Sequence, residues 1–150
     1  DRKLSQVIEY GPGDGVVTKE LLKQLSADGR LLAVEIDPGF LKMLESIRDS
    51  RLRVVNGTIQ EVSRNMEAYG SNKVDLVVSS IPFSSLSSRE REEVVRLTQR
   101  ILAPGGVFII FHQYSSIMVG PLEKYFGQVE VHFEPRNFFP CFIMSAIMKI

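Results

Sequence analysis

Short apolar runs alternate with segments of helical spacing along most of the chain, and this alternation restricts the fold more than any other feature. Runs typical of strands occur at residues 6–10, 31–36, 53–56, 74–79 and 107–111. Segments with apolar residues at helical spacing follow them, at residues 17–25, 38–47, 61–69, 87–101 and 121–126. Such alternation predicts βα units, in which parallel strands form one sheet that helices cover on both faces.

The last part of the chain has a different pattern. Residues 129–133 and 141–150 are both strand-like, and no long helix fits between them. We therefore expect these two strands to pair antiparallel. The sequence thus predicts an α/β, Rossmann-like, mostly parallel sheet with helices on both faces and a C-terminal antiparallel strand pair, within one domain of residues 1–150.

The segment after the second predicted strand carries a clear helix start. Asp37 can cap the first turn, and Pro38 fits the first helical position. We expect Phe40, Leu44 and Ile47 to share the buried face of this helix, because they recur at helical spacing.

Charge balance and cysteine count limit the classes of function. Lysine plus arginine number 18, as do aspartate plus glutamate, so the formal net charge of zero disfavours broad nucleic-acid binding. The single cysteine, Cys141, excludes an internal disulfide and fits a reducing cytoplasm. No apolar run approaches the roughly 20 residues that span a bilayer, so we expect a cytoplasmic protein. The chain begins with Asp1 rather than Met, so we expect a native N-terminal segment to be missing, which could carry a membrane-binding amphipathic helix.

Three glycines separate the first predicted strand from the first predicted helix. Gly11, Gly13 and Gly15 stand at alternate positions, where backbone N–H groups can face a ligand without side-chain collision. Glu35 ends the second predicted strand about 20 residues later, where an acidic side chain can accept hydrogen bonds from ribose hydroxyls. A structural turn and a solvated strand end are the alternative interpretations. Together the two features favour a ligand that contains ribose.

Three segments resemble class I S-adenosylmethionine-dependent methyltransferases. They are residues 9–15 (EYGPGDG), 33–38 (AVEIDP) and 102–108 (LAPGGVF). The dinucleotide pattern Gly-x-Gly-x-x-Gly is not met, because the third glycine comes one residue early, and this favours a methyltransferase over a nicotinamide dehydrogenase. The resemblance covers nearly the whole chain and implies an enzyme with S-adenosylmethionine as its cofactor.

The same resemblance implies a set of cofactor contacts. Glu9 would lie near the methionine amine, Glu35 would hold the ribose, and Ile36 and Ile59 would enclose the adenine. Thr58 stands where the family often has an acidic residue for the adenine amine, and a hydroxyl can accept the same hydrogen bond. The implied cofactor residues are Glu9, Tyr10, Gly11, Pro12, Gly13, Gly15, Glu35, Ile36, Gly57, Thr58, Ile59 and Ser79.

Residues 79–83 (SSIPF) follow the fourth predicted strand and bear on the methyl acceptor. They resemble the Asn-Leu-Pro-Phe/Tyr motif of the ribosomal RNA adenine dimethylases. However, Ser80 stands at the asparagine position, and one hydroxyl cannot offer the paired hydrogen bonds of an amide. The segment is more similar to a loop of the bacterial phospholipid N-methyltransferases, which convert phosphatidylethanolamine to phosphatidylcholine. Residues 136–140 (RNFFP) resemble a turn of that family.

The closer resemblance implies a phospholipid head-group amine as the acceptor, with peripheral membrane contact and with nucleic acid less favoured. The alternatives are an RNA adenine N-methyltransferase and a non-catalytic module that binds S-adenosylmethionine. No metal is expected.

Methyl transfer to an amine is an in-line displacement, in which the protein mainly aligns the amine and excludes water. We expect catalytic contacts from Ser80, Phe83 and Tyr114. Aromatic faces suit methylated ammonium groups, and the candidates, with core packing as the alternative, are Phe83, Tyr114, Phe138 and Phe139. Candidate proton acceptors are Tyr114, His112 and Glu134, and Arg136 is a candidate partner for a lipid phosphate.

Overall fold

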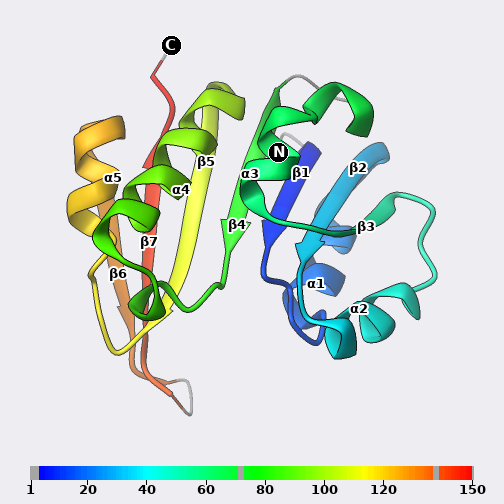
Figure 1. Ribbon diagram of the computed structural model, residues 1–150, viewed down its shortest axis with the longest axis horizontal. Coiled ribbons are helices and arrows are strands. Elements are labelled where there is room, and N and C mark those ends of the chain that lie inside the picture. Colours follow the sequence, from blue (N-terminus) through cyan, green and yellow to red (C-terminus); the bar gives the residue numbers. More distant parts are fainter. Residues whose placement is uncertain (1–3, 71–72, 137–138, 150) are drawn as a thin grey trace.

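A seven-stranded sheet runs through the centre of the molecule (Figure 1). The computed structural model describes residues 4–70, 73–136 and 139–149. The strands are β1 (Leu4–Tyr10), β2 (Leu25–Glu35), β3 (Leu52–Asn56), β4 (Val74–Ser79), β5 (Leu102–Gln113), β6 (Val129–Glu134) and β7 (Cys141–Ile147). The helices are α1 (Val16–Gln24), α2 (Pro38–Glu45), α3 (Ile59–Arg64), α4 (Ser88–Ile101) and α5 (Val119–Phe126), with short 3₁₀ turns η1 (Met66–Tyr69) and η2 (Phe83–Ser85).

The strand order is β3-β2-β1-β4-β5-β7-β6. Strands β1 to β5 pair parallel with one another, whereas β7 runs antiparallel to both β5 and β6. The predicted Rossmann-like, mostly parallel sheet with a C-terminal antiparallel pair is therefore confirmed. The chain first builds outward from β1 to β3 and then crosses back to β4. This reversal leaves the carboxyl ends of β1 and β4 side by side, where ligands of such sheets bind.

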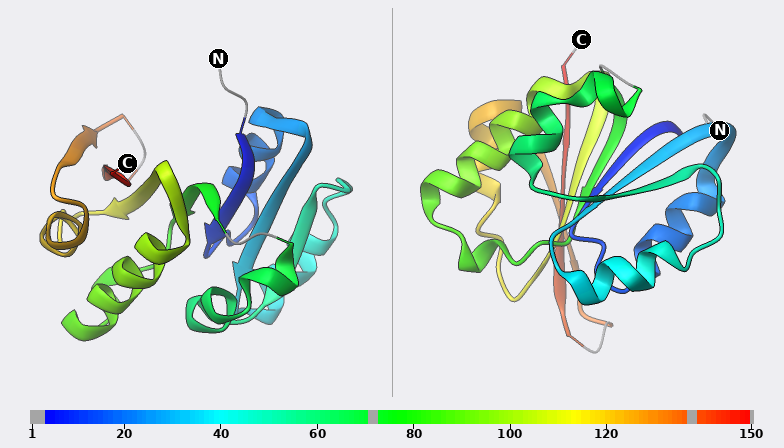
Figure 2. Two further views of the ribbon diagram at one scale, coloured as in Figure 1. Left: turned by 90° about the horizontal axis from the view of Figure 1, so that it is seen from above. Right: turned by 45° about the vertical axis from the view of Figure 1, so that its right-hand side comes forward.

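Helices cover both faces of the sheet, as predicted (Figure 2). On one face α1 packs through Leu22 against Val7 and Leu31 of the sheet. On the other face lie α3, α4 and α5, and Figure 1 shows α3 and α4 in front of the strands. Two separate apolar layers therefore hold the sheet between its helices.

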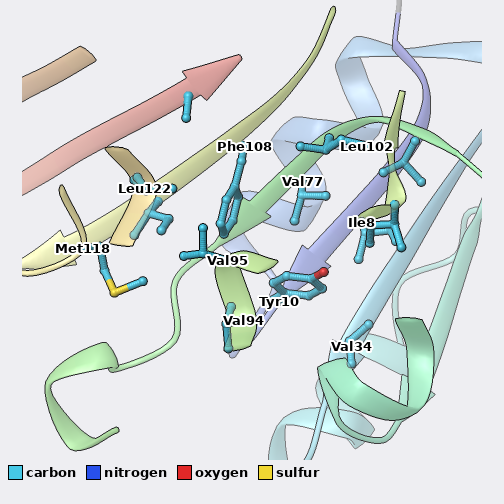
Figure 3. Close-up of a cluster of buried hydrophobic side chains, with 14 of the residues drawn as sticks. Ile8, Tyr10, Val34, Val77, Val94, Val95, Leu102, Phe108, Met118 and Leu122 are labelled. Carbon is cyan, nitrogen blue, oxygen red and sulfur yellow. The ribbon is translucent and has the colours of Figure 1, made fainter. Parts of the chain in front are cut away.

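The larger apolar layer is the cluster under α3, α4 and α5 (Figure 3). Tyr10 of β1 and Phe108 of β5 are buried there with their ring centroids 6.4 Å apart in an edge-to-face arrangement. Burial of a large apolar side chain contributes about 1.5–3 kcal/mol. Thr98 donates a hydrogen bond of 3.3 Å to the Tyr10 hydroxyl, so this buried polar group has a partner. Because the Tyr10 side chain is buried in the core, its predicted contact with the cofactor could involve only the backbone of this residue.

The start of α2 is where the sequence predicts it, but the buried face of this helix differs from the prediction. Asp37 caps the helix, because its Oδ1 accepts hydrogen bonds from the backbone N–H groups of Gly39 and Phe40. Leu44 is fully buried, whereas Phe40 is 40% exposed and Ile47 lies beyond the end of the helix. The predicted buried stripe is therefore wrong at Phe40, since an eight-residue helix brings only Leu44 fully beneath its neighbours.

Two other helix boundaries differ from the predicted ranges. α1 ends at Gln24, and Leu25 already begins β2. The segment predicted as one helix over residues 61–69 divides into α3 and η1 at Asn65. The Asn65 side chain donates to the Glu61 carbonyl at 2.8 Å, so it replaces a backbone partner and ends the helix there. The last strand stops at Ile147 rather than at the chain end.

Among the helices within the described ranges, none is both long enough and apolar enough to cross a bilayer.

Candidate functional site

The carboxyl ends of the parallel strands meet at one edge of the sheet, the lower edge in Figure 1. The glycine loop follows β1, and the segment that contains Ser80 follows β4. These two connections touch, because Ser80 donates its backbone N–H to the Tyr10 carbonyl at 3.1 Å. The structure thus brings the predicted cofactor loop and the predicted acceptor loop together.

The glycine loop depends on left-handed backbone at Gly11 and Gly13, with φ of +65° and +57°. A Cβ on Gly11 would lie 2.6 Å from Cγ2 of Ile81, so the acceptor loop packs where a side chain would stand. A Cβ on Gly13 would meet nothing within 4 Å. Gly11 therefore allows two loops to touch, whereas Gly13 leaves open backbone that a ligand can approach.

The Glu35 carboxylate fixes the end of β2 to the glycine loop. Its Oε2 accepts from the Gly13 N–H at 3.1 Å, and its Oε1 accepts from the N–H groups of Ile36 and Asp37 at 2.9 and 3.0 Å. A carboxylate has about four acceptor positions, so one remains for a ligand hydroxyl. The contact of this carboxylate with a ribose stays a prediction.

Glu9 is a buried carboxyl group beneath the glycine loop. Its Oε2 accepts a hydrogen bond of 2.6 Å from the Thr18 hydroxyl, while its Oε1 is buried with no partner among the described residues. Burial raises the pKa of Glu9 from 4.5 to about 7, opposed by the Thr18 hydrogen bond and assisted by the negative charge of Glu35. A buried acceptor without a donor is costly, and a cationic amine would satisfy it.

The predicted adenine contacts lie at the ends of β2 and β3. Ile36 is 67% exposed, which leaves an apolar side chain free to pack on a flat ring. Thr58 caps α3, because its hydroxyl accepts from the Glu61 N–H at 3.2 Å and its own N–H donates to the Glu61 carboxylate at 2.7 Å. The hydroxyl retains one acceptor lone pair, so its predicted bond to adenine is compatible with this cap.

The acceptor loop, which follows β4, contains both exposed and buried side chains. Ser80 is exposed, whereas Ser79 is buried and its Oγ has no partner among the described residues. Phe83 is fully buried, with its ring centroid 6.2 Å from that of His112. The Phe83 ring therefore faces the core rather than the open edge, which disfavours its predicted contact with a cation and favours the alternative of core packing.

An exposed aromatic pair lies beyond β5. Tyr114 is 68% exposed at a left-handed φ of 62°, a conformation rare for a bulky side chain. Its ring meets Phe139 edge-to-face with centroids 6.2 Å apart. Phe138, the third predicted aromatic of this region, lies outside the described residues. Tyr114 and Phe139 are thus a pair of largely exposed aromatic side chains, 68% and 48% accessible, and aromatic side chains of this kind can attract a cation.

Glu134 is a poor candidate for the proton acceptor. Arg136 donates to both of its carboxylate oxygens, at 2.8 and 2.7 Å. These hydrogen bonds lower the pKa of Glu134 to about 2, so it releases a proton rather than taking one at neutral pH. The structure argues against this prediction and leaves His112 and Tyr114. Arg136 itself is highly exposed, so its predicted phosphate contact would compete with Glu134.

The sequence reasoning missed Thr18 and Ile81. Thr18 donates a hydrogen bond to one of the two carboxylate oxygens of Glu9. Ile81 lies so near position 11 that only glycine fits there. Neither had a signal in the sequence, because the first contact arises from how α1 packs on β1 and the second from how the segment after β4 packs on the glycine loop.

One cavity of the molecule lies away from this edge. A cavity of about 360 Å³ opens at the amino-terminal ends of the strands, lined in part by Gln6, Arg30, Arg53 and Tyr69. Within the described ranges, no group of three or more His, Cys, Asp or Glu side chains could hold a metal ion.

The strand order, the glycine loop after β1 and the acidic end of β2 define a Rossmann-like fold with a candidate ligand site at its carboxyl edge. Residues 7–106 match the family described as methyltransferase domain, and the chain belongs to this family. The family uses S-adenosylmethionine as its methyl donor. The orphaned Glu9 oxygen and the open backbone at Gly13 fit that group, whose amine is cationic.

Sequence relatives differ in their acceptors. The chain is 29% identical over 136 residues to an ornithine lipid N-methyltransferase of Singulisphaera acidiphila, covering 89% of this chain and 71% of the relative. It is 27% identical over 138 residues to the ubiquinone/menaquinone biosynthesis C-methyltransferase UbiE of Escherichia fergusonii, covering 90% of this chain. The chain spans about half of the length of that C-methyltransferase, at 53%.

Solved structures agree on the fold. The N-methyltransferase NodS from Bradyrhizobium japonicum superposes with a TM-score of 0.80 at 15% identity, over 98% of this chain and 87% of that one. A spermidine synthase in complex with a transition state analogue gives a TM-score of 0.73 at 18% identity, over 99% of this chain and 54% of that one. At these identities the likeness shows the fold alone.

Proposed function

We propose that this chain is the catalytic domain of an N-methyltransferase that acts on the head-group amine of a phospholipid of the phosphatidylethanolamine type. The observation that carries the proposal is the exposed Tyr114–Phe139 ring pair at the carboxyl edge of the sheet. An amine becomes a larger and less hydrated cation as it gains methyl groups, and aromatic faces attract such cations. A carbon acceptor carries no such charge.

The sequence relatives support a lipid amine more than a nucleobase. The ornithine lipid N-methyltransferase at 29% identity is named for transfer to a lipid nitrogen. Ser80 lacks the amide that could pair with adenine, and the net charge of zero gives little attraction for RNA. The ribosomal RNA adenine alternative therefore has the weaker support.

In this proposal the protein contributes binding and alignment. S-adenosylmethionine supplies the activated methyl group when it is bound. Glu9 would receive the methionine amine, Glu35 the ribose, and Ile36 the adenine. Ser80 and Tyr114 would border the acceptor amine from the ends of β4 and β5. Alignment of donor and acceptor in one line is the main catalytic effect expected of such a site.

Carbon methylation of a quinone precursor is the second candidate, because the UbiE relatives match at 27% identity. The two candidates differ in the need for a cation site. A module that binds S-adenosylmethionine without turnover is the third candidate, and only an activity measurement separates it from the others.

The test is transfer of labelled methyl groups from S-adenosylmethionine to defined acceptors. These are vesicles of phosphatidylethanolamine, vesicles of ornithine lipid, a demethylated quinone and ribosomal RNA. We expect label in the amine lipids, and vesicles of phosphatidylcholine, which has no methylatable amine, serve as the blank. Label in RNA or quinone with none in lipid would overturn the proposal, and no label in any acceptor would favour the binding module.

Two variants refine the test. Phe139→Ala removes one ring of the exposed pair and should lower kcat/KM for the dimethylated lipid by about tenfold, because a partly desolvated cation–π contact contributes about 1–2 kcal/mol. Phe133→Ala is the matched control, since Phe133 is an equally exposed aromatic of β6 that packs on Phe142 instead. An equal change in kcat/KM in the two variants would show that the Tyr114–Phe139 pair is not part of the acceptor site.

A further inference from the structure

His112 lies where the acceptor site is expected, near the carboxyl end of β5. Ser79, the last residue of β4, pairs with Ile110, so His112 stands two residues beyond the end of the neighbouring strand. Side chains alternate along a strand, which puts His112 on the same face as Ile110 and next to Phe83. The imidazole therefore packs against the segment that follows β4, through Phe83.

A hydrogen bond fixes which ring nitrogen of His112 is free. Nδ1 lies 3.0 Å from the backbone carbonyl oxygen of Ser115. A carbonyl oxygen can only accept, so Nδ1 carries the hydrogen, and in the neutral ring Nε2 carries a lone pair. The orientation is built into the fold, because Ser115 belongs to the turn that directly follows β5.

Nε2 of His112 accepts no hydrogen bond from any residue that the structure describes. The residue as a whole is 6% exposed, so only a small part of its surface is accessible. The lone pair of Nε2 is therefore not engaged by the described part of the chain.

We propose that Nε2 of His112 is the general base that removes a proton from the acceptor ammonium before each methyl transfer. This inference rests on the proposed function, since only an amine acceptor needs the step. The proton moves from the ammonium to Nε2, which leaves a neutral amine and an imidazolium. The amine lone pair then forms the N–C bond, while the electrons of the breaking C–S bond return to sulfur. The imidazolium finally releases the proton to water.

Other titratable groups near His112 are less suited to the task. Glu134 is held by Arg136 with its pKa lowered to about 2. Tyr114 follows on the same segment, but its side chain is 68% exposed and its ring meets Phe139. Cys141 on β7 is buried. Imidazole is the side chain that gains and loses a proton in the neutral range.

The test is His112→Asn in the full chain, with vesicles of phosphatidylethanolamine as the acceptor. The asparagine amide can still donate to the Ser115 carbonyl, so the turn is retained, but the lone pair of Nε2 is lost. We expect unchanged S-adenosylmethionine affinity by calorimetry and an unchanged thermal midpoint. At pH 7 kcat should fall about 10²- to 10⁴-fold, the usual contribution of a general base. His132→Asn is the matched control, because His132 is an exposed histidine on β6.

The pH dependence of kcat separates a base from a structural residue. Without a base the variant relies on amine that is already neutral, so its kcat should rise about tenfold per pH unit from pH 7 to 9, and its deficit should shrink. A deficit that stays constant with pH, or activity within about threefold of wild type, would overturn the role of His112 alone. If the wild type methylates no amine, the proposed function itself fails.

Discussion

Folding changes the pKa values of single side chains at the carboxyl edge, and Glu9 is the clearest case. Its pKa is raised from 4.5 to about 7, chiefly by burial. The native state therefore binds the Glu9 proton more tightly than the unfolded state does. The stability that this provides is fully present below pH 4.5 and is lost as pH rises through 7.

We expect Glu9→Gln to stabilise the unliganded protein at pH 8 by up to about 3 kcal/mol, since it removes the cost of a buried charge. The gain should vanish below pH 4.5, where Glu9 is neutral in both states. Urea unfolding from pH 4 to pH 8 measures this difference, with Glu20→Gln on the exposed side of α1 as the control. A constant difference between Glu9→Gln and wild type over this range would contradict the raised pKa. The same variant should bind S-adenosylmethionine more weakly, because the amine loses its anionic partner.

The secondary-structure elements are joined at the site by short turns, and the glycine loop between β1 and α1 is the turn with the most specific demands. We expect Gly13→Ala to lower the free energy of unfolding by about 1–2 kcal/mol, because an L residue is strained at φ +57°. Its added Cβ meets no protein atom within 4 Å, so the fold should persist. The methyl group would stand on the open backbone where the cofactor approaches, and affinity should fall at least tenfold.

Gly105→Ala is the matched control for this change. Gly105 also has a left-handed φ, +77°, and a Cβ there also meets nothing within 4 Å. However, it lies near the start of β5, at the end of that strand opposite the cofactor loop. Calorimetric titration with S-adenosylmethionine should find normal affinity in Gly105→Ala and weak binding in Gly13→Ala at similar stability. Normal affinity in both variants would mean that the loop does not face the cofactor.

Two helices begin with the same reciprocal cap, which allows a second matched comparison. Thr58 with Glu61 opens α3, and Ser87 with Glu90 opens α4. Replacing either cap residue by alanine should lower the free energy of unfolding by about 1 kcal/mol. Only Thr58→Ala should also weaken S-adenosylmethionine binding, because Thr58 is the predicted acceptor for the adenine amine. Thermal unfolding and cofactor titration of both variants give the comparison, and an equal cofactor affinity in the two would exclude this role of Thr58.

The succession of elements could be predicted from the sequence, because alternation and caps are local signals. Asp37 capped its helix as expected, since an N-cap depends on neighbours within three residues. Phe40 was assigned to the core wrongly, because helical spacing identifies a face of a helix but not how much of that face reaches the sheet. The hydrogen bond from the Asn65 side chain, which divides α3 from η1, competes with the backbone hydrogen bonds of the helix. The spacing of apolar residues could not predict this hydrogen bond.

The complete sheet decides which loops become neighbours, and this determines how much of the site could be foreseen. Glu35 ends β2 and the glycine loop follows the adjacent strand β1, so their proximity could be predicted from the order of elements. The contact between Gly11 and Ile81 joins residues 70 positions apart and exists because β4 pairs with β1. The free nitrogen of His112 depends on a turn after β5. These features follow from long-range packing, which no short segment of the sequence specifies.

The overall charge of the molecule leads to a last prediction, on the effect of salt. The 18 basic and 18 acidic residues balance, and Arg136 near the acceptor edge is already paired with Glu134. Attraction to a polyanion should therefore contribute little to substrate binding. We expect kcat/KM for phosphatidylethanolamine vesicles to change by less than about threefold between 50 and 200 mM salt. A protein that neutralises 6–10 phosphates of a nucleic acid loses about 10³- to 10⁵-fold in affinity over that range. A loss of that size would show that the acceptor is held through many phosphates, which fits an RNA and contradicts a single lipid head group.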